Sequence, residues 1–137
     1  MKTLLIITAA IEAATGLALV SAPAMVATLL LGTWIAAPAA QIVARIAGAA
    51  LLALSLGCWL ARTGTSGMAA RGLIAAMLLY NAATVVILAY AAFMLGLSGF
   101  VLWAAVVVHM ALAIWCLACL RSVVSSAAET PRALESR

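Results

Sequence analysis

The stretch that decides the fold is LLIITAAIEAATGLALV, residues 4–20, which is apolar throughout except for threonines, a glycine and one glutamate near its centre. A helix rises about 1.5 Å per residue, so roughly 18 residues cover about 27 Å and cross the hydrocarbon core of a bilayer. A carboxyl group inside such a segment is costly and normally faces a protein interior. Glu12 therefore marks a membrane-crossing helix, expected over residues 3–20, and a candidate functional site.

The whole chain has a composition typical of membrane proteins. It has 137 residues, of which 69% are hydrophobic and 7% are charged, whereas soluble domains carry about 25% charged residues. A soluble domain of this length cannot bury so much apolar surface. The lipid bilayer is therefore the expected partner. The net charge of +4 comes from scattered positions, so no basic stripe is present and nucleic acid is not expected to bind.

Three further apolar segments are long enough to span a bilayer; they are residues 41–61, 72–95 and 100–120. The sequence therefore predicts an all-α fold, an integral membrane antiparallel bundle of four transmembrane helices. This domain is expected over residues 1–121, and residues 122–137 are expected to form a polar, loosely ordered cytoplasmic tail.

A shorter helix is predicted between the first two spans. Pro23 and Gly32 enclose a brief apolar run, and proline suits the first turn of a helix while glycine suits the position after its end. The run, residues 24–31, is too short to cross. We expect it to lie at the outer interface, with Trp34 at the level of the headgroups.

The positions of the basic residues predict the topology. Outside the spans they are confined to the N-terminus, the loop between the second and third spans, and the tail; they are Lys2, Arg62, Arg71, Arg121, Arg132 and Arg137. Because positive residues are retained on the cytoplasmic side, both termini are expected in the cytoplasm, with the protein in the inner (plasma) membrane. Glu12 and the spans that follow it argue against cleavage of the first span as a signal peptide.

Each of the four spans carries one strongly polar residue: Glu12, Arg45, Asn81 and His109. Counting from the inner boundary places Glu12 and Asn81 about 15 Å deep and His109 about 18 Å deep. Arg45 lies at about 25 Å, and its long side chain can reach inward or outward. Three of the four helices thus bring a polar side chain to one level, near the middle of the membrane.

Polar groups in hydrocarbon satisfy one another because an unpaired ion or amide is costly there. We expect Glu12 and Arg45 to form a charge-assisted pair, with hydrogen-bonding contacts from Tyr80, Asn81 and His109. These five are the candidate ligand-binding residues. The pair has two open interpretations: a structural salt bridge, or a site for a ligand or a proton. No catalytic residue and no metal site are predicted.

Two other features bear on cofactors. The chain has one histidine, so a bis-histidine haem could form only between chains, whereas a hydrogen bond from His109 to a quinone ring is possible. Cys116 and Cys119 have C-x-x-C spacing, but they lie in an apolar helix near the reducing cytoplasmic side, where cysteine packs well as a small apolar residue. Cys58 is interpreted as core packing as well.

Several segments resemble the small DoxX-like bacterial membrane proteins. They are the glutamate-bearing first helix, Leu-Leu-Leu-Gly at 29–32 and Ala-Arg-Ile-Ala-Gly at 44–48. This resemblance implies a four-helix inner-membrane bundle, and for some relatives a role beside quinone-linked sulfur or redox enzymes. The carboxylate in the first helix is also similar to that of small multidrug transporters, although the one-sided charge distribution differs from their dual topology.

Three functions follow as hypotheses. The first is an accessory or ligand-binding subunit whose polar centre holds a quinone- or lipid-like molecule. The second is a small proton-coupled transporter using Glu12. The third is a structural subunit of a homo-oligomer or of a larger membrane complex, recognised through alanine- and glycine-rich faces.

Overall fold

The computed structural model describes residues 1–64 and 67–135, with side chains as far as Ser122. Within these residues the chain is helical and contains five helices, which are α1 (Lys2–Ser21), α2 (Pro23–Leu31), α3 (Pro38–Ala61), α4 (Met68–Leu95) and α5 (Leu102–Glu135). Four of them are long and apolar enough to cross a membrane: α1, α3, α4 and, in α5, the stretch Leu102–Ser122. The all-α prediction and the short second helix are confirmed.

The helix boundaries follow the proline and glycine positions. Pro23 and Pro38 stand in the first turns of α2 and α3, where the missing N–H would have no intrahelical partner in any case. Gly32 and Gly96 follow α2 and α4 with φ of 72° and 65°, a left-handed conformation that glycine adopts without steric cost. The predicted start and end of the short helix are therefore confirmed.

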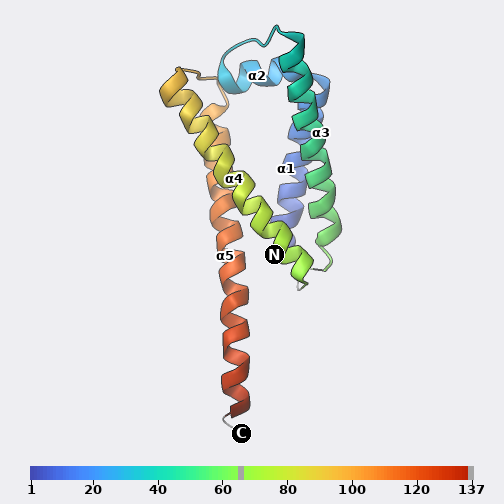
Figure 1. Cartoon of the computed structure of the whole chain (residues 1–137), viewed down its shortest axis with the longest axis vertical. Helices are drawn as coiled ribbons and strands as arrows, with labels where there is room; N and C mark the ends of the chain where they lie inside the picture. The colour runs from blue at the N-terminus through green and yellow to red at the C-terminus, as the bar shows by residue number, and fades with distance from the viewer. Residues whose placement is uncertain (65–66, 136–137) are drawn as a thin grey trace.

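Helices α1 and α3 pack closely in opposite directions and form the first hairpin (Figure 1). Gly16 and Gly48 face each other at the contact: a Cβ on Gly16 would lie 2.8 Å from the Gly48 carbonyl oxygen, and one on Gly48 would lie 2.7 Å from the Gly16 oxygen. Further along, the buried Ser55 hydroxyl donates to the Ala9 carbonyl at 2.7 Å. The backbones approach this closely because neither glycine carries a side chain.

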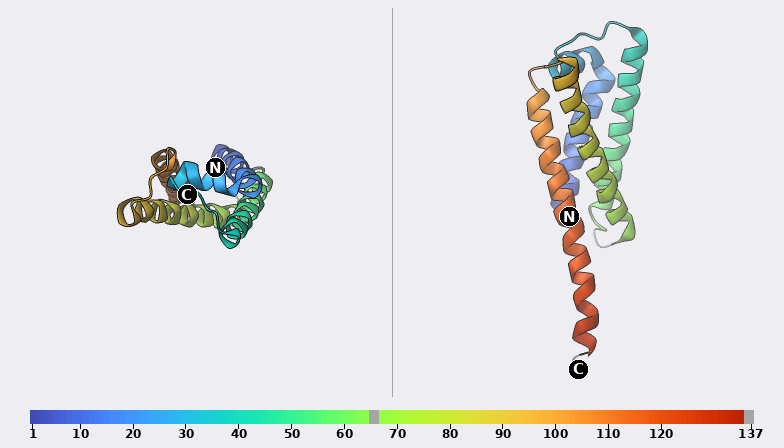
Figure 2. Two further views of the ribbon diagram at one scale, coloured as in Figure 1. Left: turned by 90° about the horizontal axis from the view of Figure 1, so that it is seen from above. Right: turned by 60° about the vertical axis from the view of Figure 1, so that its left-hand side comes forward.

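Helices α4 and α5 form the second hairpin, and the two hairpins touch mainly at one end (Figures 1 and 2). There a buried apolar cluster joins α1, α3, α4 and α5; its members include Leu4, Leu5, Cys58, Ile74, Met77, Leu112 and Cys116. From this end α4 runs diagonally away from α1 and α3. The hairpins therefore diverge toward the end where α2 lies, and α2 crosses the gap between them.

The turn before α5 is hydrogen-bonded to the end of α2. The Gly99 N–H donates to the Leu30 carbonyl at 3.2 Å, and the Val101 N–H donates to the Leu29 carbonyl at 3.0 Å. A Cβ on Gly99 would lie 2.2 Å from the Leu29 oxygen, so the approach requires glycine. These bonds satisfy carbonyls that a helix end leaves without intrahelical partners, and they fix α2 to the second hairpin.

The fourth apolar helix is longer than predicted. The apolar span was expected over residues 100–120 and lies at Leu102–Ser122, while the helix itself continues to Glu135 through the segment that was expected to form a loosely ordered tail. Alanine, leucine, arginine and glutamate in the tail favour this conformation. The side chains of residues 123–137, including Arg132 and Arg137, lie outside the described part of the chain.

Candidate functional site

Glu12 is enclosed by the helices. Its side chain is 1% exposed, and its Oε1 atom has no hydrogen-bond partner. The Tyr80 side chain from α4 lies near the same carboxyl group. One turn away on α1, the Thr8 hydroxyl is also buried and unpartnered. The prediction that Glu12 faces the interior is confirmed.

The predicted pair between Glu12 and Arg45 is wrong. Arg45 donates through Nε to the Val20 carbonyl at 3.1 Å, so it is level with the end of α1. Glu12 lies eight residues back along that helix, or about 12 Å away, which is farther than the arginine side chain extends. Arg45 turns outward because the last carbonyls of α1 lack intrahelical partners and attract a cation.

Asn81 and His109 join the two helices of the second hairpin. Asn81 is fully buried, and its Nδ2 donates to the Met77 carbonyl at 2.7 Å. Its Oδ1 therefore faces His109, whose Nδ1 lies 2.7 Å away. Because Oδ1 can only accept, Nδ1 must carry the proton. In the neutral ring Nε2 is then left as a hydrogen-bond acceptor.

Tyr80 links this pair to Glu12. Its ring meets the His109 ring edge to face, with centroids 5.7 Å apart and an interplanar angle of 79°. In the next turn, Thr84 donates to the Tyr80 carbonyl at 2.9 Å. These contacts bring Asn81, Tyr80 and His109 together, with Glu12 near Tyr80. Of the five candidate residues, the structure brings four together and leaves out Arg45.

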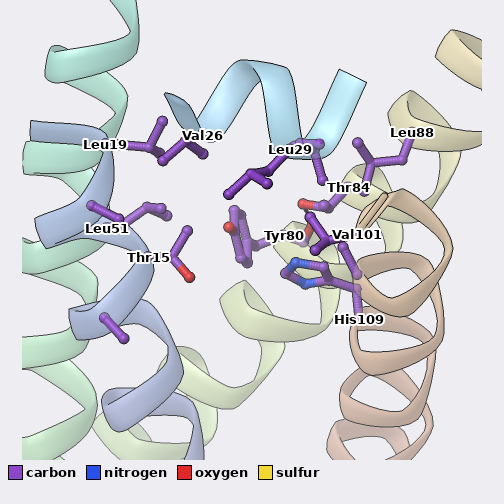
Figure 3. A pocket seen from close by; sticks show the side chains of 14 residues that line it. Thr15, Leu19, Val26, Leu29, Leu51, Tyr80, Thr84, Leu88, Val101 and His109 are labelled. Carbon is purple, nitrogen blue, oxygen red and sulfur yellow. Dashed lines mark hydrogen bonds between the residues drawn. The ribbon is translucent and has the colours of Figure 1, made fainter. Parts of the chain in front are cut away.

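A cavity of about 480 Å³ lies between the two hairpins and beneath α2 (Figure 3). All five helices contribute to its wall; the residues labelled in the figure are Thr15, Leu19, Val26, Leu29, Leu51, Tyr80, Thr84, Leu88, Val101 and His109. The wall is aliphatic except for the two threonines, Tyr80 and His109. This volume and this mixture of a largely apolar wall with a few polar groups are typical of small-molecule sites.

Two parts of this wall were not predicted. Thr15 is not among the five candidate ligand-binding residues, and it points into the cavity opposite Tyr80 (Figure 3). Helix α2, which was expected to lie at the outer interface, also forms the roof of the cavity through Val26 and Leu29. Glu12 and Asn81 lie behind the wall, where they contact Tyr80 and His109.

The cysteines lie apart from the cavity. Cys58, Cys116 and Cys119 are free thiols, and the first two belong to the buried cluster at the opposite end of the helices. Their position in that cluster agrees with a packing role. Within the part of the chain that the structure describes, no three histidine, cysteine or acidic side chains are grouped as metal ligands.

Comparison with known proteins gives no relative: no family model, no curated protein and no solved structure matches the chain.

Proposed function

We propose that this chain is a multi-pass membrane protein, an antiparallel bundle of four transmembrane helices, which binds one small amphipathic molecule between its two hairpins. The observation that carries the proposal is the cavity of about 480 Å³, with aliphatic walls and with Tyr80 and His109 on one side. We further propose that it acts as an accessory, non-catalytic subunit, in a homo-oligomer or with a larger membrane complex, as the resemblance to DoxX-like proteins implies.

The distribution of charge supports the orientation. The start of α1, the end of α3 and the start of α4 lie at one end of the molecule (Figure 1), and they carry Lys2, Arg62 and Arg71. The opposite end holds α2 and exposed aromatic side chains, among them Trp34 and Phe100. By the positive-inside rule and the preference of aromatic rings for the interface, the charged end and both termini face the cytoplasm, and α2 lies on the outer side of the inner membrane.

The polar groups define the chemistry of the ligand. With Nδ1 bound to Asn81, the neutral His109 ring presents Nε2 as an acceptor, so the matching ligand atom is a hydroxyl. The Thr15 hydroxyl, on the opposite wall, can donate to or accept from the same headgroup. The aliphatic walls match a hydrocarbon body. A quinol, or a lipid with a hydroxyl headgroup, combines these properties.

Substitutions of the polar residues in the cavity wall test this proposal. The protein is purified in mild detergent, and the apolar molecules that co-purify are measured by native mass spectrometry. Tyr80→Phe deletes only a hydroxyl, and Tyr90→Phe is the matched control because Tyr90 is on the same helix but 57% exposed. We expect His109→Ala to abolish the bound species and Tyr80→Phe to reduce it about tenfold, as the loss of one buried hydrogen bond implies, with Tyr90→Phe unchanged.

The structural-subunit hypothesis predicts a different result. If His109→Ala and Tyr80→Phe lower the unfolding temperature but no apolar molecule is ever detected on the folded wild-type protein, the ligand-binding proposal is wrong. If the bound species remains at wild-type occupancy in folded His109→Ala, the cavity is not its site.

A second candidate function, proton-coupled transport, is favoured by one observation. The Glu12 Oε1 atom is buried without a partner, and intramembrane carboxyl groups in this situation commonly carry protons or cations. This function requires flux driven by a proton gradient in proteoliposomes, lost in Glu12→Gln. Ligand binding without flux under any gradient would leave only the binding function.

A further inference from the structure

A second concave site lies at the outer end of the molecule, which we call the outer groove. Its volume is about 240 Å³, and the end of α1, the start of α2, the start of α3 and the segment before α3 enclose it. The residues that matter for its chemistry are Ser21, Ala24, Met25, Trp34, Gln41 and Arg45. It shares no lining residue with the cavity between the hairpins.

Arg45 gives the outer groove a positive charge that the chain does not neutralise. Among the residues that the structure describes, the guanidinium group makes one hydrogen bond, from Nε to the Val20 carbonyl, although it has five N–H donors. The chain has three acidic residues. Glu12 lies about 12 Å away along α1, and Glu129 and Glu135 belong to the far end of α5. A half-buried cation whose bond in the described part of the chain is to a neutral carbonyl selects an anionic ligand.

The surroundings of Arg45 suit a phosphate at the membrane surface. The first backbone bond of α2 starts at the Val26 N–H, so the preceding amides of Ala24 and Met25 have no intrahelical acceptor. The Gln41 side chain donates to the Ile35 carbonyl at 3.1 Å and so holds the segment that carries Trp34. Trp34 is 65% exposed and Met25 is 52% exposed, which leaves apolar surface beside the charge.

We propose that the outer groove binds a phosphate group, with Arg45 as the principal contact and an anionic phospholipid of the outer leaflet as its source. Arginine recognises phosphate through its planar fork of donors. Exposed tryptophan and methionine beside it match the interface between headgroup and acyl chain. The proposal rests on the membrane placement above, but not on a ligand in the cavity between the hairpins.

The test compares phosphate sources on the full chain in neutral detergent. Binding of phosphatidylglycerol, phosphatidylcholine and inorganic phosphate is measured by native mass spectrometry and by the shift in unfolding temperature. We expect tighter binding of phosphatidylglycerol than of phosphatidylcholine. Arg45→Met should weaken phosphatidylglycerol binding about fivefold, as the loss of one cation near a lipid surface implies. Arg45→Lys should lie between because it keeps the charge and loses the fork.

Two sets of control substitutions test whether the preference for phosphatidylglycerol arises in the outer groove. Arg71→Met removes a cation at the opposite end of the molecule and should leave the outer-groove preference intact. Met25→Glu places a carboxylate in the groove without removing the bond from Arg45 to Val20, and it should weaken binding while Met25→Gln does not. This pair keeps the test decisive if Arg45→Met does not fold.

The outcomes separate the possible sources. Protection by inorganic phosphate alone that depends on Arg45 supports the anion site with a free anion as its ligand, whereas protection only by phosphatidylglycerol supports the lipid. Equal binding of phosphatidylglycerol and phosphatidylcholine by the wild-type protein, or an unchanged preference in Met25→Glu, overturns the proposal. Either result leaves the proposed ligand of the cavity between the hairpins unaffected.

Discussion

At the scale of single residues, Asn81 determines what His109 can offer a ligand. The Met77 carbonyl orients the amide, the amide oxygen then fixes the proton on Nδ1 of the ring, and Nε2 remains an acceptor. Two short contacts within one hairpin thus convert a histidine that could bond in several ways into one with a defined role.

The separation of Glu12 and Arg45 leads to a prediction about their energetic coupling. Residues more than about 7–10 Å apart with no shared partner contribute additively to stability, within about 0.3–0.5 kcal/mol. A double-mutant cycle of Glu12→Gln and Arg45→Met, measured by reversible unfolding in detergent, should therefore give a coupling energy within this error. A coupling of about 1 kcal/mol or more would show that the two side chains do form an ion pair.

For Arg45, the sequence predicted the depth of the residue but not the direction of its side chain. Counting residues placed it nearer the outer surface than Glu12, and the structure agrees, because a helix has a fixed rise per residue. The direction of its side chain was not predictable. The acceptor that competes with Glu12 for Arg45 is the Val20 backbone carbonyl. A comparison of side chains along the sequence does not include the free backbone carbonyls at a helix end.

At the scale of elements, the contact between α1 and α3 depends on two glycines. Gly48→Ala would place a methyl group 2.7 Å from the Gly16 carbonyl oxygen, so the backbones must separate. We expect a loss of about 1–3 kcal/mol in the free energy of unfolding, typical of overpacked sites. The matched control is Gly72→Ala in α4, where nothing lies within 4 Å of the added Cβ.

In the control, alanine should be neutral or stabilising because it favours the helix more than glycine does. Thermal unfolding of both variants in the same detergent makes the comparison. Similar stability of Gly48→Ala and Gly72→Ala would contradict a close contact at Gly16 and Gly48.

For the short helix α2, the sequence predicted the two ends but not the contacts that the helix makes in the folded protein. Pro23 and Gly32 predicted its start and end because their effects on the backbone are local. Its role as the roof of the cavity was not predicted, because that role depends on bonds to Gly99 and Val101, about seventy residues later in the chain. Nothing within α2 itself identifies that partner.

At the scale of the whole molecule, the protein consists of two hairpins joined at both ends by different means. At one end they share a buried apolar cluster, and at the other α2 is bonded to the turn before α5. Glu12 of α1 and Asn81 of α4 are buried among the helices, and Asn81 is bonded to His109 of α5, as expected when polar groups in apolar surroundings satisfy one another. The cavity above them arises because α4 runs diagonally, a feature of assembly that hydropathy along the chain does not encode.

The connection between α2 and Gly99 leads to a prediction at this scale. A methyl group on Gly99 would lie 2.2 Å from the Leu29 carbonyl oxygen, so Gly99→Ala must displace the roof from the second hairpin. We expect the loss of the co-purifying apolar molecule and a decrease of about 1–3 kcal/mol in stability. Gly64→Ala, in an open loop with nothing within 4 Å, is the control. Wild-type occupancy in Gly99→Ala would show that α2 does not close the cavity.

The proposed binding of a hydroxyl-bearing apolar molecule at His109 can be observed directly because the chain contains one histidine. The most direct measurement is therefore the nitrogen NMR spectrum of protein labelled with ¹⁵N only at histidine, titrated with a short-chain quinol in detergent. We expect a saturable shift of the Nε2 signal, while Nδ1 remains protonated and bonded to Asn81. Saturable binding that leaves both ring nitrogens unchanged, or a protonated Nε2 in the ligand-free protein, would contradict it.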